Sequence, residues 1–218
     1  MAKKTCSYCG KLLDSYDTEH VFPSCLYPPS KQQSRVQRLT IPSCNECNNG
    51  WSDDEAHFRN VLMLAGEPNA PRREIWEGPV LRSFDEVDGI KRMDDLLHLM
   101  RPIDMDEGTR YMIFPAEDSR VLRVVRKVVR GLCHYHQVLS PVFDHQVWVD
   151  TLRYQAPPGY LETMEYHHRE PDIAEYWYQI FDEDEIHSAW IISFFNRVDF
   201  IGRVSKTGWG LIASENKA

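Results

Sequence analysis

The sequence lacks the long apolar runs and the leader features that would place the chain in a membrane or export it. No apolar run approaches the roughly 18 residues that a membrane-spanning helix needs. The first residues, Met-Ala-Lys-Lys-Thr-Cys, have no apolar segment behind their lysines, which argues against a secretory signal. We therefore expect a protein of the reducing cytoplasm that has no membrane partner.

The sequence also lacks a positive net charge. It holds 25 Lys and Arg against 33 Asp and Glu, a net charge of −8. Contacts to phosphate need Lys and Arg, so this balance excludes a protein that binds nucleic acid through overall basicity. The acidity is uneven, because residues 1–70 carry a net charge of −1 and residues 71–218 carry −7. Nucleic-acid binding would then need a local basic patch or a partner that supplies one.

The sequence shows no internal repeat and no low-complexity tract. Its 218 residues suffice for one domain of ordinary size or two small ones. The apolar and charged fractions are those of a soluble globular protein. We expect two parts, an N-terminal module over residues 1–66 and a unit of unknown role over residues 67–218.

Six cysteines are present, and four of them form two Cys-x-x-Cys pairs, which in the cytoplasm usually hold a metal ion. Two such pairs present four thiolates, the usual ligand set of a tetrahedral zinc site. All four ligand positions would be filled, so this zinc would be structural. The alternatives are two redox pairs or a chance spacing. The expected zinc ligands are Cys6, Cys9, Cys44 and Cys47.

The N-terminal module is predicted to contain a zinc knuckle, which is the turn that carries Cys6 and Cys9, followed by two short strands and a helix. Residues 18–23 and 35–41 have strand character, and each of these runs is stopped by proline. Ser52 to Glu55 matches a capping box that would open a helix. The two Cys-x-x-Cys pairs bracket the strands, so zinc would staple a region with few apolar residues of its own.

The rest of the chain reads as a mixed α+β unit that ends in antiparallel strands. Residues 67–80 hold three prolines and one glycine and are expected to form a linker or long connection. Helical patterns follow over residues 81–100 and, from a capping Ser119, over residues 119–134. The expected strands cover residues 110–114, 176–181, 189–195 and 198–204.

The second of these helices has a basic side opposite its apolar stripe. Arg123, Lys127 and Arg130 lie together there and could hold phosphates. A charged outer face is also the ordinary surface of an amphipathic helix, and the sequence does not decide between the two interpretations.

A Glu-His pair, Glu19 and His20, lies between the two Cys-x-x-Cys pairs, and Asn48 follows the last cysteine. Glu-His is a common dipeptide that alone would suggest a solvated surface pair. In this setting the residue types match phosphodiester hydrolysis. A neutral imidazole is a suitable base near pH 7, and a carboxylate with an amide oxygen suits a hard divalent cation.

These motifs together resemble the HNH endonuclease family of the zinc-hook type over roughly residues 3–65. The resemblance implies a ββα-metal fold, two strands and a helix around one catalytic ion. It implies that His20 is the general base and that Glu19 and Asn48 bind a Mg²⁺ or Mn²⁺ ion, with Asn49 as a substitute ligand. One feature departs from the family, because residues 30–38 lack the central asparagine that helps to orient the base.

The sequence therefore predicts a metal-dependent endonuclease, acting on DNA in preference to RNA, in a setting such as bacterial or phage restriction or defence. The alternative is a catalytically inactive zinc module that binds a protein or nucleic acid. The missing asparagine and the negative charge favour the alternative, and the intact Glu-His pair favours the enzyme. A protein partner or a homo-oligomer stays open.

Overall fold

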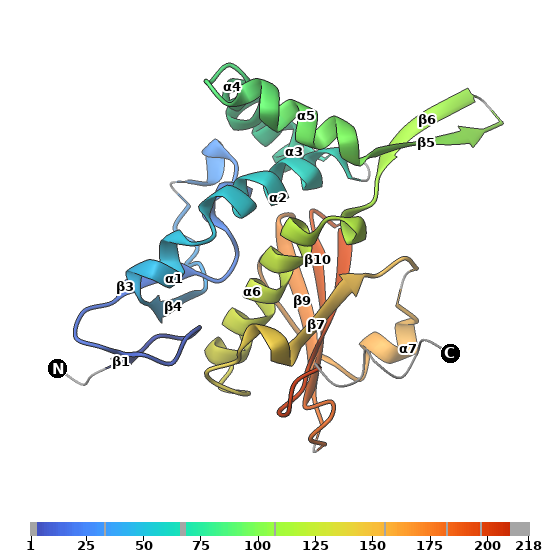
Figure 1. The fold of residues 1–218 in the computed structure, drawn as a ribbon. Helices are drawn as coiled ribbons and strands as arrows, with labels where there is room; N and C mark the ends of the chain where they lie inside the picture. Colours follow the sequence, from blue (N-terminus) through green and yellow to red (C-terminus); the bar gives the residue numbers. More distant parts are fainter. Residues whose placement is uncertain are drawn as a thin grey trace.

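The computed structural model describes residues 4–32, 34–65, 69–106, 108–154, 156–181, 183–196 and 198–209. The chain is a mixed α+β protein, as predicted, and ends in an antiparallel sheet. Figure 1 shows a central helix lying across this sheet, with the N-terminal region on its other side. No helix in the described ranges is both long and apolar enough to cross a membrane.

The sheet has five antiparallel strands in the order β7-β11-β10-β9-β8. Its middle strand β10 is buried at all seven positions, which explains its run of apolar and aromatic residues. The three C-terminal strands that the sequence predicted are thus confirmed. The strands are β7 (Val147–Thr151), β8 (Glu165–Glu170), β9 (Ala174–Ile180), β10 (Ser188–Phe194) and β11 (Val198–Val204); a short helix, α7 (Pro158–Leu161), lies between β7 and β8.

The central helix is α6 (Ser119–Tyr135). Its N-cap is Asp118, whose carboxylate accepts hydrogen bonds from the amides of Arg120 and Val121, so the predicted cap at Ser119 is wrong by one residue. The helix approaches β11 closely at Gly202. A Cβ atom there would lie 2.8 Å from a methyl carbon of Val129, too near for a side chain. The sheet and the helix therefore share a tightly packed interface.

The N-terminal region contains the predicted order of knuckle, strand, strand and helix. β3 and β4 pair antiparallel, but β4 begins at Thr40 and not at residue 35, and it includes Pro42. Alternate residues of such a pair point their N–H away from the partner, so Pro42 costs no ladder bond. Its carbonyl accepts from the amide and hydroxyl of Ser7. The elements are β1 (Lys4–Thr5), β2 (Leu12–Leu13), β3 (Asp17–His20), β4 (Thr40–Ser43), α1 (Asn45–Asn49) and α2 (Ser52–Leu64).

The predicted capping box at the start of α2 is wrong. Trp51 occupies the N-cap position, and the Ser52 hydroxyl donates to the carbonyl of Asn49 instead of accepting from an early amide of α2. Glu55 turns away from the helix end and binds a lysine of α6. Glu55 matched the sequence pattern of a capping box, but in the structure its carboxylate binds a buried lysine instead of the amides at the start of α2.

The segment predicted as a linker is helical where the structure describes it. The Asn69 side chain caps the helix by accepting from the amide of Arg72, and Pro71 stands in the first turn, where its missing N–H costs nothing. Pro79 lies within a π-helical turn. Most of the prolines that suggested a linker are thus absorbed into helices. The elements are α3 (Ala70–Ile75), the π-helical turn (Trp76–Val80), α4 (Leu81–Phe84) and α5 (Gly89–Leu99).

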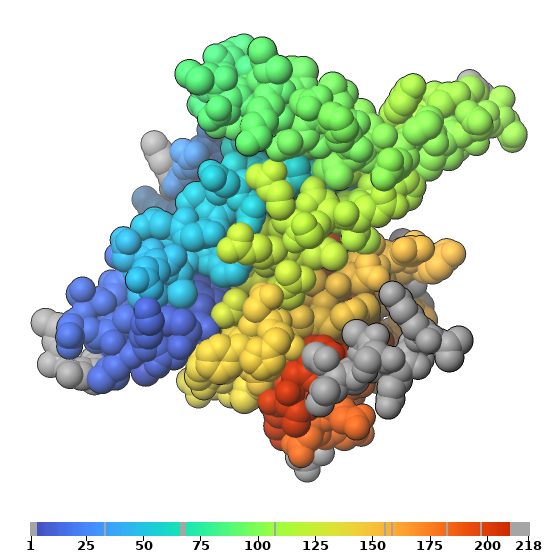
Figure 2. Space-filling view, viewed as in Figure 1, coloured from blue at the N-terminus to red at the C-terminus, as the bar shows by residue number. Residues whose placement is uncertain are grey.

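A two-stranded hairpin, β5 (Met100–Met105) and β6 (Gly108–Ile113), joins α5 to α6 and projects from the body. Figures 1 and 2 both show it extending away from the rest of the molecule. The predicted strand over residues 110–114 overlaps β6, the second strand of this hairpin.

One hydrophobic core includes residues from the N-terminal region and from the C-terminal sheet. Phe58 of α2 contacts Phe194 and Phe200 of the sheet, with ring centroids 5.2 and 6.2 Å apart. Phe22, which follows β3, lies 6.0 Å from Phe194. The two predicted parts are therefore packed against each other directly. The predicted boundary between them, at residues 66 and 67, lies outside the described residues.

Candidate functional site

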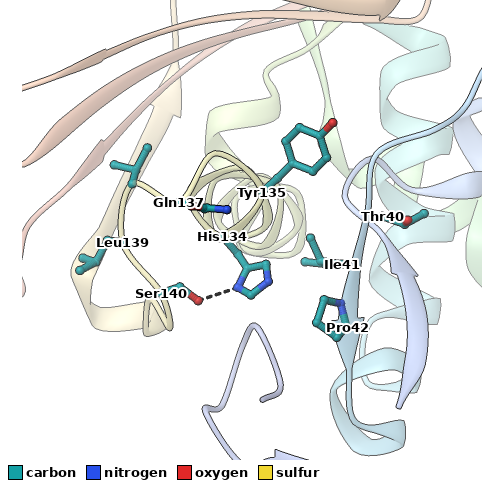
Figure 3. Close-up of a pocket in the computed structure, with 9 residues that line it drawn as sticks. Thr40, Ile41, Pro42, His134, Tyr135, Gln137, Leu139 and Ser140 are labelled. Atoms are coloured by element: carbon teal, nitrogen blue, oxygen red, sulfur yellow. Dashed lines mark hydrogen bonds between the residues drawn. The ribbon is translucent and has the colours of Figure 1, made fainter. Parts of the chain in front are cut away.

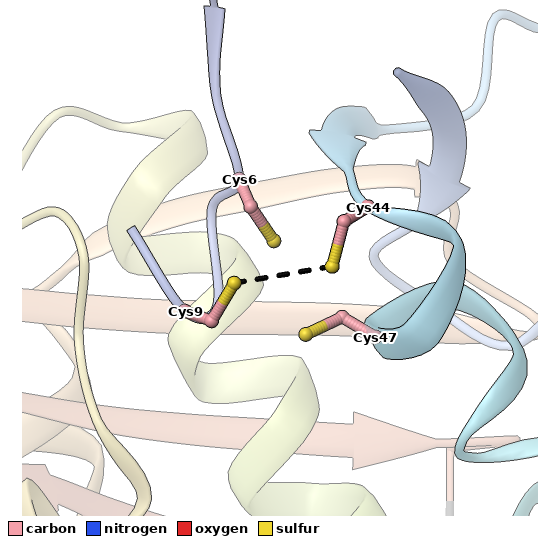
Figure 4. A group of neighbouring side chains, drawn as sticks. All are labelled: Cys6, Cys9, Cys44 and Cys47. Carbon is pink, nitrogen blue, oxygen red and sulfur yellow. Dashed lines mark hydrogen bonds between the residues drawn. The ribbon is translucent and has the colours of Figure 1, made fainter. Parts of the chain in front are cut away.

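The four predicted zinc ligands lie together (Figure 4). Cys6 and Cys9 come from the knuckle between β1 and β2, and Cys44 and Cys47 come from the start of α1. All four sulfur atoms lie within 4.8 Å of one another, and those of Cys9 and Cys44 are 3.9 Å apart. Tetrahedral zinc with bonds of about 2.3 Å needs sulfurs about 3.8 Å apart. The group can therefore hold a zinc ion.

The backbone around the knuckle is shaped for thiolates. Gly10 has φ +73°, a left-handed conformation that closes the turn so that its amide donates to the carbonyl of Cys6. Burial acts to raise the pKa of Cys6, but amides of Cys44, Cys9 and Tyr8 donate to its sulfur and bring the pKa down to about 6. Such donors are typical of sulfurs that carry negative charge.

Glu19 and His20 leave β3 on opposite sides, as neighbouring strand residues must. Glu19 pairs with Ile41 across the hairpin and is buried with it, whereas His20 pairs with Thr40 on the other face and is half-buried. The predicted Glu-His pair thus does not converge on one point from β3. The Glu19 side chain lies on the buried face of the hairpin, and the His20 side chain lies on the opposite face.

The Glu19 carboxylate binds the ammonium group of Lys127, which also binds Glu55. Lys127 is fully buried and comes from the middle of α6. Burial raises the pKa of Glu19, and the charge and hydrogen bond of Lys127 oppose that rise. The three side chains form a buried cluster, here called the lysine clamp, that ties β3 and α2 to α6.

The lysine clamp corrects the predicted basic outer face of α6. Lys127 and Arg130 are buried, and only Arg123 is exposed at the surface. Arg130 donates to the carbonyls of Tyr8 and Val142 at 2.8 and 2.7 Å, and Arg123 binds Asp54 at 2.5 Å. This side of α6 faces the N-terminal region of the same chain. Two of the three residues expected to hold phosphates, Lys127 and Arg130, therefore belong to an internal interface.

His20 has a positively charged neighbour that the sequence analysis did not single out, Arg38. The hairpin register continues beyond the strands, since the amide of Val21 donates to the carbonyl of Leu39, so Arg38 falls on the His20 side as a diagonal neighbour. The guanidinium carbon lies 3.9 Å from the centroid of the Tyr27 ring. Burial, Arg38 and Lys127 together lower the pKa of His20, which keeps its imidazole neutral near pH 7.

Asn48 lies on α1, which packs against β3, and is half-buried. Asn49 ends the same helix and is exposed. Within the described ranges, the four cysteines are the only His, Cys, Asp and Glu group close enough to hold a metal ion. The Glu19 carboxylate is already bonded to the ammonium group of Lys127, which it shares with Glu55. The predicted catalytic divalent ion on Glu19 and Asn48 is therefore not supported.

A pocket of 640 Å³ lies between β4 and the C-terminal end of α6 (Figure 3). Thr40, the cross-strand partner of His20, lines it, together with Pro42 and His134. The His134 ring is 2.6 Å from the Ser140 hydroxyl, and burial and then the charge of Lys4 lower its pKa. The pocket provides space next to the strand that carries His20.

Comparison with known proteins found no matching family model, no matching curated protein and no matching solved structure.

The sequence analysis missed Arg38, and it named Lys127 only as part of a possible phosphate-binding face and not as the buried partner of Glu19. Lys127 has Val124 and Val128 as its neighbours at i−3 and i+1, so it lies toward the buried side of the helix, and that was the available signal. Arg38 could have been found only by fixing the hairpin register, which depends on where β4 begins.

Proposed function

We propose that this chain is an endonuclease that hydrolyses phosphodiester bonds, with His20 as the general base. The observation that carries the proposal is a neutral, half-buried histidine on a two-stranded hairpin followed by a helix, with four clustered cysteines bracketing the hairpin. This arrangement is consistent with the resemblance of the motifs to zinc-hook HNH endonucleases. As that resemblance implies, the proposed substrate is DNA in preference to RNA.

The cysteine group contributes rigidity in this proposal. A structural zinc ion on Cys6, Cys9, Cys44 and Cys47 would fix the knuckle to the start of α1. β4 leads directly into the second pair of ligands, and Ser7 of the knuckle is bonded to Pro42 of β4. Zinc would therefore hold the hairpin, and with it His20, in place.

In the proposed reaction His20 removes a proton from water and the resulting hydroxide attacks phosphorus. The bond from phosphorus to the 3′ oxygen breaks, and that oxygen leaves as an alcohol after taking a proton from solvent. Negative charge grows on the phosphoryl and leaving oxygens and needs a nearby cation. Arg38 lies on the same face as His20 and is the residue that we assign to this role, as a bidentate donor to the phosphate.

The expected Mg²⁺ or Mn²⁺ ion on Glu19 and Asn48 would have to compete with Lys127 for the Glu19 carboxylate. Cleavage by this arrangement would rest on His20 and Arg38. Cleavage that requires added Mg²⁺ would instead support a divalent ion at the site, which Glu19 could bind only after leaving the lysine clamp.

The test is nicking of supercoiled plasmid by the purified zinc-loaded protein, with and without added Mg²⁺. His20→Ala should abolish nicking, and Arg38→Ala should weaken it strongly while Arg38→Lys retains part of it. His98→Ala is the matched control, because His98 is exposed on α5. Zinc content and melting temperature should stay unchanged in every variant. Nicking that persists in His20→Ala at the wild-type rate rules the proposal out.

A second candidate is a catalytically inactive zinc module that binds a protein or nucleic acid. The lysine clamp favours it, because a carboxylate bonded to a buried lysine is what a decayed metal site would leave behind. Capture of DNA, RNA or a protein partner by wild type and His20→Ala alike, with no nicking by either, would support this candidate over the nuclease.

A further inference from the structure

The pocket between β4 and the C-terminal end of α6 differs in charge from the rest of this acidic chain. None of its nine lining residues is acidic, although the chain carries 33 Asp and Glu. Four other cavities in the described part of the chain each have at least two carboxylates in their lining. Burial and then the charge of Lys4 lower the pKa of His134 in the wall, and Arg169 donates to the Tyr135 hydroxyl at 3.1 Å. The pocket therefore suits a ligand that carries phosphate.

The walls of this pocket combine apolar surface with hydrogen-bonding groups. Its volume of 640 Å³ is within the range of about 300–1,000 Å³ that small-ligand sites occupy. The Tyr135 ring and the Leu139 side chain supply apolar contact, and Gln137 supplies an amide (Figure 3). The His134 Nδ1 lies 2.6 Å from the Ser140 hydroxyl, which leaves Nε2 for a ligand. A flat heteroaromatic ring with donors and acceptors along its edge matches these walls.

The free edge of β4 adds backbone groups on the side of the pocket nearest to His20. The amide of Val21 donates to the carbonyl of Leu39, so the next cross-strand pair, His20 and Thr40, is of the non-hydrogen-bonded type. Thr40 therefore directs its own N–H and C=O away from β3, toward the edge of β4 that borders the pocket. The Cα atoms of such a pair are about 4.5 Å apart, so the pocket begins one strand away from His20.

The residue that ends α6 at the pocket has an unfavourable backbone conformation. The amides of Gln137 and Val138 donate to the carbonyls of His134 and Cys133 at 3.1 and 2.9 Å, which is the Schellman motif. Gln137 takes its left-handed position, with φ +56°, where glycine is the usual residue because it has no Cβ. Strained positions of this kind are concentrated at functional sites. A side chain kept there at such a cost points to a ligand for its amide.

We propose that this pocket, here called the base pocket, binds one nucleobase next to the phosphodiester bond that His20 attacks. The Tyr135 ring stacks on the base, and the Gln137 amide hydrogen-bonds to its edge. The base must lie outside a helical stack, so it is unpaired or is flipped out of a duplex. This inference rests on the proposed function and adds to it, because it names a strand with an unpaired nucleotide as the substrate.

The test is fluorescence anisotropy of a labelled DNA duplex that carries one unpaired nucleotide, which fixes the position of the bound base. The zinc-loaded full chain carries His20→Ala, so that no cleavage interferes. In this background Tyr135→Ala should weaken binding about 5- to 100-fold, the range for one stacked base, and Tyr135→Phe should retain it. Tyr160→Ala is the matched control, because Tyr160 on α7 is 39% exposed and Tyr135 is 37% exposed. Melting curves should show that every variant is folded.

Removing the base from the DNA identifies the contact. A duplex with an abasic unpaired nucleotide should bind more weakly than the first duplex by the same factor as Tyr135→Ala, and Tyr135→Ala should not distinguish the two duplexes. A fully paired duplex should also bind more weakly. Equal binding of the normal and abasic duplexes, or equal binding by the background protein and Tyr135→Ala, overturns the base pocket.

Replacing Gln137 by glycine separates a binding role from a structural one. Gln137→Gly relieves the left-handed backbone, so its melting temperature should rise, while DNA binding should weaken about 2- to 10-fold through the lost amide. A higher melting temperature with unchanged binding overturns the role of Gln137.

The nuclease and the base pocket can fail separately. Nicking by wild type that His20→Ala abolishes, with no effect of Tyr135→Ala on binding, would leave the nuclease in place and overturn the pocket. Binding that depends on the unpaired base and on Tyr135, with no nicking by wild type, would support the pocket and overturn the nuclease.

Discussion

Replacing Lys127 by methionine tests how the N-terminal region is fixed to the rest of the chain. Methionine nearly matches the length of lysine but leaves Glu19 and Glu55 facing each other without a positive charge. Removing one partner from a buried ion group costs about 3–5 kcal/mol. We therefore expect a loss of about 3–5 kcal/mol in the free energy of unfolding at pH 7, which corresponds to a fall in melting temperature of about 6–20 °C.

The assay is urea denaturation of the zinc-loaded protein, followed by fluorescence and circular dichroism. Lys206→Met is the control, because Lys206 makes an ion pair with Asp184 at the surface and its loss should cost under about 1 kcal/mol. The triple variant Glu19→Gln, Glu55→Gln, Lys127→Met removes every charge of the lysine clamp. It should recover most of the loss, which separates the charge effect from a packing effect of methionine.

The pH dependence of the free energy of unfolding gives a second test of the Lys127→Met variant. Burial raises the pKa of Glu19 and Lys127 opposes that rise, so the pKa should rise further in Lys127→Met. A carboxyl group whose pKa is raised by folding stabilises the protein fully below its unfolded pKa and loses this stabilisation as pH rises through the folded pKa. The variant should thus gain stability relative to wild type between pH 7 and pH 5, by up to about 1.4 kcal/mol per pH unit from Glu19. A variant within about 1 kcal/mol of wild type at pH 7, with no such slope, refutes the reasoning.

Three further predictions concern zinc, the base and the core. Cys44→Ala should lose bound zinc and melt at a lower temperature, whereas Cys25→Ala, outside the group, should keep its zinc; normal zinc content in Cys44→Ala contradicts the site. The pKa of His20 is lowered from 6.5, so the acid limb of the cleavage rate should fall below pH 6.5, and a limb above that value argues for another base. Phe58→Ala should lose about 3–5 kcal/mol of stability in urea denaturation because Phe58 packs on the sheet, while Phe143→Ala, at the surface, should lose far less.

The sequence predicted the elements whose patterns depend on local physics. The aromatic and β-branched runs of β9, β10 and β11 were found, as was the helix of α6 from its apolar spacing. Prolines misled in two places, because Pro42 fits a strand edge and Pro79 fits a helical turn. A proline is tolerated inside a strand or helix only where the backbone N–H at that position would have no hydrogen-bond partner, and a single sequence does not show where that is.

The part of the candidate site that follows from the spacing of residues in the sequence was predicted. The four cysteines of the two Cys-x-x-Cys pairs lie together, because the hairpin of β3 and β4 brings the chain back to the first pair. The partners of Glu19 and His20 could not be read in the same way. Lys127 lies 108 residues from Glu19, and only tertiary packing reveals that the two are paired. The basic side of α6 was recognised but assigned to an external ligand, when its partner is the same chain.

The central claim is that His20 activates water for attack on a phosphodiester bond. Its most direct test is the single-turnover cleavage rate of an end-labelled DNA duplex by zinc-loaded wild type and by His20→Ala. A general base contributes about 10²- to 10⁴-fold, so the account predicts a loss of that size with unchanged DNA binding and zinc content. Equal rates for the two proteins, or no cleavage by wild type with or without Mg²⁺, would contradict it.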